Sequence, residues 1–401
     1  MPFWQKLGAG KAVPEGRPDE TTEPPASSTK SPLNAFGLAL LREECTLKPE
    51  ANVFLSPLSI FLALAMTENG SAGETRAAMR RVLALPADAG AEALNQSAAA
   101  LLKSLPSHEE AELTIANALW VDTGSLISPD FVELSRRVYD ATVRTLDLRR
   151  PSSAGTINDW VSSQTGGKIP GIVTPDGIAE TSAILTNAVY FQAKFSIPFR
   201  KEATQPQNFF LPDGRTKLVP MMHMSMMHVG SLTGAYRSGG NFEAALLPYA
   251  GTRFMLYLLL PAQGSSPEQI LTAGALQPAV VPGPADRLNL SLPRFIVNCS
   301  VDLRKSLTQM GMGIAFQNPG ADFSLLGSPP FCIGQVLHKS RLEVDEEGTV
   351  ATAATAVLAV PTMARRKPAE SKTLVFDRPF AVVVIDSTTG ALVFVGVVRE
   401  P

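Results

Sequence analysis

The sequence predicts an α+β fold, because helical patterns crowd its first half and strand patterns dominate its second half without βα alternation. Of its 401 residues, 45% are hydrophobic and 18% are charged, which is typical of a globular protein with a large core. The 35 basic and 37 acidic residues nearly balance, so we expect neither nucleic acid nor an anionic membrane as a partner. No apolar run of about 18 residues occurs, and no transmembrane helix is predicted.

The chain opens with a polar segment. Met1–Gly10 has no long apolar stretch and does not fit the pattern of a secretory signal. Lys11–Ser31 is rich in Pro, Glu, Thr and Ser. We therefore expect a disordered tail over residues 1–31 and one folded domain over residues 32–401.

Helix signals follow the tail. Ser56 is a good N-cap with Pro57 at the first helical position, and Asn69 with Gly70 forms a suitable C-terminal stop. Apolar residues with helical spacing predict an earlier helix that begins near Pro32. The same spacing predicts four more helices, over Gly73–Leu83, Ala91–Leu105, Pro129–Tyr139 and Ser152–Gln164.

Strand patterns appear twice in the first half and dominate from residue 241 onward. The turn formers of Asp386–Gly390 predict a hairpin between the last two strands. The expected strands are Glu112–Val121, Thr181–Phe191, Ala244–Leu247, Phe254–Leu260, Arg287–Pro293, Phe380–Ile385 and Leu392–Val398.

The sequence lacks the common catalytic motifs. It has no G-x-S-x-G elbow, no H-E-x-x-H, no Walker A and no G-x-G-x-x-G after a strand. The Met-rich stretch around His223 and His228 is expected to be a packed strand, with a soft-metal site as the alternative. The two other histidines, His108 and His338, are far from it in sequence. We therefore expect no enzyme, no metal and no cofactor.

Three cysteines, Cys45, Cys299 and Cys332, lie far apart in the sequence. Their spacing fits neither a disulfide framework nor a metal site. We expect buried free thiols, with a single incidental disulfide as the alternative.

The most informative segment is Leu342–Pro379. An acidic stretch, Glu343–Glu347, is followed by Gly348 and then by Thr349–Thr362, which contains no charged residue. At about 3.3 Å per residue this uncharged run spans about 46 Å, which is long for a strand, whereas a linker seldom carries so much Val, Leu and Ala. A segment that is an exposed loop in one conformation and a buried central strand in another satisfies both observations. Small uncharged side chains enter a sheet without steric blockage or desolvation cost, and Gly348 gives backbone freedom at the hinge.

Several motifs occur in the order of one known family. Glu343–Ala356 resembles the hinge of the serpins, Asn52–Ile60 resembles their second-helix signature, and Leu185–Phe191 is similar to a central sheet strand of theirs. Further similar motifs are Val219–Met222, Leu292–Phe295, His338–Lys339, Phe376–Phe380 and Phe394–Pro401. The resemblance extends from about Pro32 to Pro401.

The resemblance implies a serpin fold with about eight to nine helices, three β-sheets, an incomplete five-stranded central sheet and an exposed reactive loop at about residues 346–375. It also implies the mechanism. A target serine protease cuts the loop and forms an acyl-enzyme, and the loop then inserts as a new central strand and distorts the protease. We expect a monomer whose partner is that protease, bound covalently. A cofactor of the heparin kind is not indicated, because Ala91–Leu105 holds only Lys103 as a base.

The resemblance further implies roles for particular residues. The implied hinge residues are Glu346, Glu347, Gly348, Thr349, Ala351, Ala353 and Ala354. The implied shutter, a polar cluster under the point where the sheet strands part, consists of Ser56, Ser59, Asn187 and His338. Taken alone, Ser56 also fits a simple helix cap and His338 a structural histidine. At the breach, where insertion begins, Arg294 is expected to pair with Glu346, and Phe195 in place of the usual Trp predicts looser packing.

The expected reactive bond joins Thr362 to Met363, because the family's scissile residue usually lies sixteen positions after the hinge glutamate, here Glu346. A small residue there suits an elastase-like or subtilisin-like pocket. One alternative is Met363, one residue later, which suits a chymotrypsin-like pocket. The others are Arg365 and Arg366, which suit a trypsin-like pocket but leave more residues to insert.

A non-inhibitory role as a chaperone or ligand carrier is the alternative function. Hinges of that kind hold bulky, charged or proline residues, whereas Thr349–Ala356 is made of small residues. The family implies an extracellular location, and the lack of a signal pattern leaves the cytoplasm as the alternative.

Overall fold

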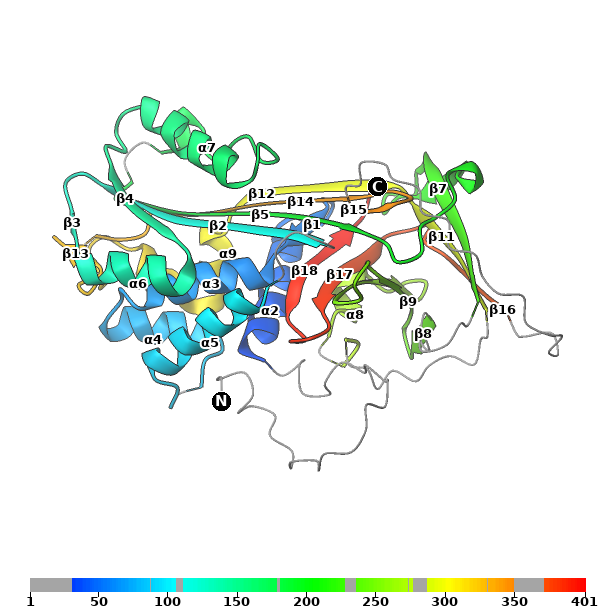
Figure 1. Cartoon of the computed structure of the whole chain (residues 1–401), viewed down its shortest axis with the longest axis horizontal. Helices are drawn as coiled ribbons and strands as arrows, with labels where there is room; N and C mark the ends of the chain where they lie inside the picture. Colours follow the sequence, from blue (N-terminus) through cyan, green and yellow to red (C-terminus); the bar gives the residue numbers. More distant parts are fainter. Residues whose placement is uncertain are drawn as a thin grey trace.

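The structure is a computed structural model, and it describes residues 31–86, 88–105, 111–178, 181–227, 236–272, 274–276, 287–329, 331–349 and 371–401. Helices gather at one end of the molecule and strands extend to the other (Figure 1). This arrangement confirms the α+β prediction. In the described part of the chain, no helix combines the length and the apolar character needed to cross a membrane.

Among the described residues six helices have ten residues or more. All six begin close to the predicted positions, and the five for which an end was predicted also end close to it. They are α2 (Pro32–Leu47), α3 (Pro57–Glu68), α4 (Gly73–Val82), α5 (Ala91–Ser104), α6 (Pro129–Tyr139) and α7 (Ser152–Gln164). Two short helices follow, α8 (Pro267–Ile270) and α9 (Arg304–Leu307).

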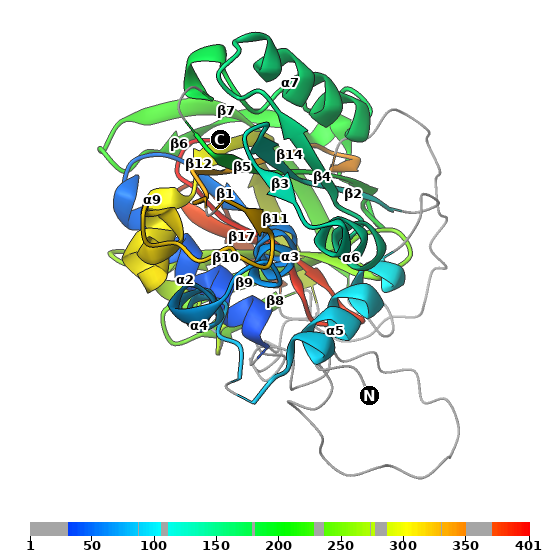
Figure 2. The same ribbon diagram turned by 90° about the vertical axis from the view of Figure 1, so that its left-hand side faces the viewer.

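Helix α3 is buried on all sides. Ser56 caps it by accepting a hydrogen bond from the Ser59 amide, with Pro57 at the first helical position. All of its residues are buried, which agrees with a sequence that is apolar around the whole helix. In both views α3 lies on one side of the central sheet, described below, and α7 on the other (Figures 1 and 2).

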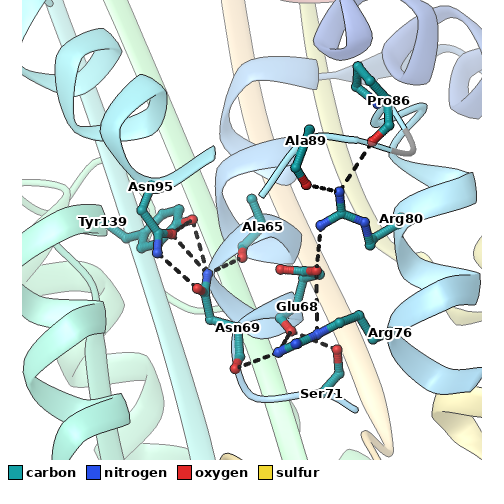
Figure 3. Close-up of polar contacts among 10 residues, drawn as sticks. All are labelled: Ala65, Glu68, Asn69, Ser71, Arg76, Arg80, Pro86, Ala89, Asn95 and Tyr139. Carbon is teal, nitrogen blue, oxygen red and sulfur yellow. Dashed lines mark hydrogen bonds and ion pairs between the residues drawn. The ribbon is translucent and has the colours of Figure 1, made fainter. Parts of the chain in front are cut away.

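An ion cluster fixes the end of α3 to α4. Glu68 is fully buried, and its Oε1 lies 3.1 Å from Arg80 Nη1 and 3.6 Å from Arg76 Nε (Figure 3). Arg80 also donates to the carbonyl oxygens of Pro86 and Ala89 in the α4–α5 connection. The cluster therefore sets where α5 begins.

A neutral network next to it joins α3 to α5 and α6. Asn69 Nδ2 donates to Asn95 Oδ1 at 3.0 Å, and the Tyr139 hydroxyl donates to the same oxygen at 2.7 Å (Figure 3). Burial raises the pKa of Tyr139, so its hydroxyl stays a donor. The ion cluster and this network together connect α3, α4, α5 and α6 through polar contacts.

The central sheet has the strand order β12-β14-β15-β5-β2-β4. Its long strands β5 and β2 pair antiparallel from Ala111–Ala193 to Val121–Ala183. Its strands are β2 (Ala111–Asp122), β4 (Thr142–Leu146), β5 (Ala183–Lys194), β12 (Phe295–Asp302), β14 (Gln335–Val344) and β15 (Gly348–Thr349). The predicted strand begins two residues before β5 and ends three residues before the end of β5.

Two further sheets pack beside the central one. The second sheet has the order β1-β18-β17-β10-β9-β8, and the third has the order β16-β11-β7-β6. The second sheet consists of β1 (Val53–Leu55), β8 (Tyr236–Gly239), β9 (Phe242–Pro248), β10 (Phe254–Pro261), β17 (Phe380–Asp386) and β18 (Leu392–Val398). The third consists of β6 (Gln205–Phe210), β7 (Thr216–Met227), β11 (Arg287–Pro293) and β16 (Ser371–Val375), and a small pair joins β3 (Leu126–Ile127) to β13 (Gly327–Ser328).

Two features of the expected loop need correction. Ser371–Val375 forms β16, so the last five residues of the expected loop range are a strand. Gly348–Thr349 already forms β15 within the central sheet, so that sheet has a sixth, two-residue strand. Residues 350–370, with Ala351, Ala353 and Ala354, lie outside the described residues.

Candidate functional site at the seam of the central sheet

The seam is the boundary between β5 and β14. These strands pair directly and in parallel from Ile184–Gln335 to Tyr190–Arg341. Beyond that, β15 separates them, with Thr349 opposite both Ala193 of β5 and Val344 of β14. We call this the hinge end of the seam, and the other, where β5 and β14 begin, the far end.

Gly348 has a conformation and a position that only glycine suits. Its φ of +151° is strained for an L side chain, and a Cβ atom there would lie 2.3 Å from the Ala193 carbonyl oxygen. The Asp345 carboxylate accepts the amides of Glu347 and Gly348 at 2.8 and 3.1 Å, which fixes the turn from β14 into β15. The chain is thus turned into the seam at a defined residue.

The two hinge glutamates are held by partners outside the seam. Glu346 is buried, and its Oε1 accepts from Arg294 Nη2 and from Thr204 Oγ1, each at 2.6 Å. Burial raises the pKa of Glu346, but these two hydrogen bonds outweigh it and leave the pKa lowered. Glu347 pairs with Lys201 Nζ at 2.5 Å.

Aromatic side chains pack against one another next to Thr349 at the hinge end of the seam. Phe195 is 5% exposed and stacks on Tyr249, with ring centroids 5.2 Å apart. The Tyr249 hydroxyl is 2.6 Å from Thr349 Oγ1, so the inserted residue has a buried polar partner. Phe199 packs edge-on against Phe195 at 6.0 Å. Phe195 is buried and stacked, and the looser packing predicted from the missing Trp stays a prediction.

A polar cluster lies under the middle of the seam, and it contains all four predicted shutter residues. The His338 ring, on β14, has Nδ1 2.5 Å from Asn187 Oδ1 and Nε2 3.3 Å from the Ser56 amide. Asn187, on β5, donates through Nδ2 to Ser59 Oγ and to Asn117 Oδ1. The Ser56 hydroxyl donates to the Val393 carbonyl oxygen at 2.7 Å.

The hydrogen bonds of His338 require a neutral ring. Nε2 accepts from the Ser56 amide, which leaves Nδ1 to carry the proton and donate to Asn187. A second proton would bring an N–H of the ring against the amide N–H of Ser56. Complete burial lowers the pKa of His338 to about 3, so the ring is uncharged near neutral pH.

Helix α7 and the segment after it cover the outer face of the seam. Lys339 Nζ, from β14, donates to the Gly171 carbonyl oxygen at 2.7 Å. Trp160 of α7 packs edge-on against Trp120 of β2, with ring centroids 5.5 Å apart. The segment around Gly171 is thus tied to β14 at the seam.

The sequence prediction missed four residues of this site. Asn117 continues the row of His338 and Asn187 across the sheet, and its only signal is an amide among the otherwise apolar residues Ile115–Val121. Tyr249, Thr204 and Lys201 lie in connections about one hundred or more residues before the hinge, and no local pattern marks them. Thr362, Met363, Arg365 and Arg366 fall outside the described residues.

Within the described residues, neither the cysteines nor a cluster of metal ligands indicates a different functional site. Cys45 and Cys299 are buried free thiols as predicted, whereas Cys332 is only half-buried. Burial raises the pKa of Cys45 to about 11, which makes its thiol unreactive at neutral pH. In the described ranges no three His, Cys, Asp or Glu side chains gather as a metal site would need.

Comparison with known protein families decides the identity of this architecture. The family model described as serpin (serine protease inhibitor) matches residues 31–401. The chain belongs to the serpin family. A serpin-like protein of Thermococcus kodakarensis is 34% identical, over 92% of this chain and 85% of its own length. Plasminogen activator inhibitor 1 of Sus scrofa is 31% identical, over 91% of each chain.

Solved serpin structures share the fold. The native state of tengpin, a thermophilic serpin, superposes with a TM-score of 0.81 at 28% identity and covers 100% of this chain and 99% of its own. Human thyroxine-binding globulin, solved with thyroxine bound, also superposes with a TM-score of 0.81, at 25% identity, covering 93% of this chain and 98% of its own. The serpin fold thus accommodates both kinds of function that the sequence left open.

Proposed function

We propose that this serpin inhibits a serine protease by offering residues 350–370 as bait and then inserting the cut segment along the seam. The observation that supports the proposal is the position of β15, which lies between β5 and β14 and pairs with both at the hinge end. The segment that follows Thr349 is small and uncharged as far as Ala364, so it meets no desolvation cost on entry. Catalysis belongs to the target, whose serine attacks the bait.

The register of β15 specifies how the segment would fit. Thr349 is opposite Ala193, and each later residue would face the preceding residue of β5, so residue 359 reaches Ala183 at the far end. Alternate side chains would then face the core, with Thr355 opposite Asn187 of the shutter. The Thr355 hydroxyl would offer a hydrogen-bond partner to the shutter side chains, whose hydrogen bonds to each other break when the seam opens.

The same register supports Thr362–Met363 as the reactive bond. Residue 359 completes the strand, and Thr362 follows three residues later, close to the far end of the sheet. Cleavage after Arg365 or Arg366 would leave three or four more residues outside, about 10–13 Å of slack between the sheet and the protease. Slack weakens the force on the acyl-enzyme, so those bonds suit a substrate and not an inhibitor.

A ligand-carrier function is the second candidate, because thyroxine-binding globulin has the same fold with thyroxine bound. The hinge argues against it. Thr349 is buried within the sheet and has Tyr249 as a hydrogen-bond partner, which is the first step of insertion.

The test is complex formation with elastase and subtilisin, read on denaturing gels. We expect an SDS-stable complex and release of a peptide with the mass of Met363–Pro401. Thr349→Arg puts a charge in the seam and should turn inhibition into simple cleavage, while Thr145→Arg, at an exposed position of β4 in the same sheet, should leave inhibition unchanged. Wild-type complex formation by Thr349→Arg would rule out insertion as the mechanism.

A further inference from the structure

A cavity of about 290 Å³ lies at the far end of the seam, away from the hinge and the shutter. The two edges of the seam are joined beside it, because the Gly334 amide donates to the Ala183 carbonyl oxygen at 2.8 Å. The side chains that line the cavity come from both edges of the seam and from α9 and the segment after it: Ser182 just before β5, Cys332 and Gln335 on the side of β14, and Arg304, Phe316 and Asn318.

Arg304 is the charged residue among the described residues that line this cavity. Its Nη1 donates to the Gly334 carbonyl oxygen at 3.4 Å, and its guanidinium carbon lies 6.0 Å from the centre of the Phe316 ring. No carboxylate within the described ranges pairs with the guanidinium, and the neighbouring Asp302 accepts the backbone amide of Arg304 at 3.0 Å instead. A guanidinium has five N–H donors, so most of them are available to a ligand.

The neutral side chains of the lining add further hydrogen-bond donors. Gln335 buries its Oε1 and leaves its amide nitrogen accessible. Neither this nitrogen, the Ser182 hydroxyl nor the Asn318 amide has a hydrogen-bond partner in the part of the chain that the structure describes. Burial raises the pKa of the Cys332 thiol, which therefore stays protonated and adds no negative charge near neutral pH. One positive charge among unpaired donors favours an anion.

We propose that this cavity binds a small organic anion, with the carboxylate or phosphate group of the anion on Arg304 and its other oxygen atoms on the neutral donors. The volume equals that of about ten liquid waters, which suits an anion of roughly ten non-hydrogen atoms better than a bare inorganic ion. Such a ligand would contact Ser182 beside β5 and Gln335 of β14 at once, and so would hold the far end of the seam closed. The site does not include the hinge or the shutter, and its occupancy does not depend on inhibition of a protease.

The test is isothermal titration calorimetry of the full-length, uncut protein with succinate and with glycerol 3-phosphate, at constant ionic strength and without protease. We expect a dissociation constant below about 1 mM for at least one of them, and the tighter ligand identifies the group as carboxylate or phosphate. The neutral counterparts succinamide and glycerol should bind at least about tenfold more weakly. At ten times its dissociation constant, the bound anion should raise the melting temperature by about 2 °C.

Variants of the lining assign the binding to this cavity. Arg304→Met should weaken binding about tenfold or more, Arg304→Lys should restore part of it, and Gln335→Leu should weaken it about fivefold. Lys305→Met is the matched control and should bind as wild type does, because this exposed neighbour removes the same charge from α9 without lining the cavity. Equal dissociation constants for wild type and Arg304→Met, or for the anions and their neutral counterparts, would overturn the proposal. So would the absence of binding by either anion at about 10 mM.

A carboxylate of the chain itself is the competing occupant. Glu180 precedes the lining residue Thr181 in the sequence and lies outside the described residues. If a ligand from solution fills the cavity, Glu180→Gln should bind the anions within about twofold of wild type. Binding by Glu180→Gln that wild type lacks would overturn the proposal and would assign Arg304 to an internal ion pair.

Discussion

At the scale of single residues, His338 couples the closed seam to pH. Its neutral ring joins β14 to Asn187 of β5 and to the Ser56 amide of the capped helix. Burial lowers its pKa from 6.5 to about 3, whereas the unfolded chain binds a proton near pH 6.5. The stability that this histidine contributes is therefore fully present above pH 6.5 and is lost progressively as the pH falls toward 3.

The predicted effect is a slope of about 1.4 kcal/mol per pH unit in that window. From pH 6.5 to pH 5, wild type should lose about 2 kcal/mol more unfolding free energy than His338→Gln, which lacks the titrating group. Urea unfolding of both proteins at several pH values measures this difference. Parallel pH profiles would mean that the ring is not neutral and buried in the native state.

Some single residues could be predicted from the sequence and others could not. Ser56 and His338 were identified because they stand in motifs that resemble known ones. Asn117 and Tyr249 act through strand pairing and packing between segments far apart in the chain, and only three-dimensional contacts reveal them.

At the scale of elements, the ion cluster of Glu68 should be a main support of the helical end. Glu68→Ala leaves Arg76 and Arg80 without their carboxylate and removes the link between α3 and α4. We predict a loss of about 3 kcal/mol in the free energy of unfolding, because removing one partner of a buried ion pair leaves the remaining charges without a counter-charge. Chemical denaturation measures it.

The matched control is Glu133→Ala on α6. Glu133 pairs with Arg136 at 2.8 Å, but both side chains are more than half exposed. Loss of that solvent-exposed pair should change stability far less than loss of Glu68. Equal effects of the two substitutions would contradict a special role for the buried cluster.

The accuracy of the element predictions followed the strength of the local signals. Helix α3 was placed to within a residue or two because Ser56 and Pro57 mark its start. Strand β14 was missed because two of its inward positions are His338 and Ser340, whose polar side chains hide the alternation of buried and exposed residues. β6 was missed because apolar side chains such as Phe210 point to solvent. Of β7 only the Met-rich stretch around His223 was predicted as a strand, and the exposed Leu218 hides the pattern of its first part.

At the scale of the whole molecule, the proposed inhibition depends on the seam between β5 and β14, which is either closed or filled by an inserted segment. Composition and pattern predicted the α+β class, but the direct pairing of β5 with β14 joins strands about 150 residues apart, and no local signal specifies it. The structure pairs these strands directly and in parallel, and the sequence supplies an uncharged segment of matching length after Thr349. The protein should therefore be metastable, with a more stable arrangement available once the segment is cut.

The most direct test is the melting temperature of the protein before and after cleavage of the segment between residues 350 and 370. A cut segment that fills the seam pairs with β5 on one side and β14 on the other, and we predict a rise of at least about 10 °C. The comparison uses the same preparation, with cleavage verified by intact mass and the protease removed. An unchanged or lower melting temperature of the fully cleaved protein would contradict insertion and would favour a serpin that binds without inhibiting.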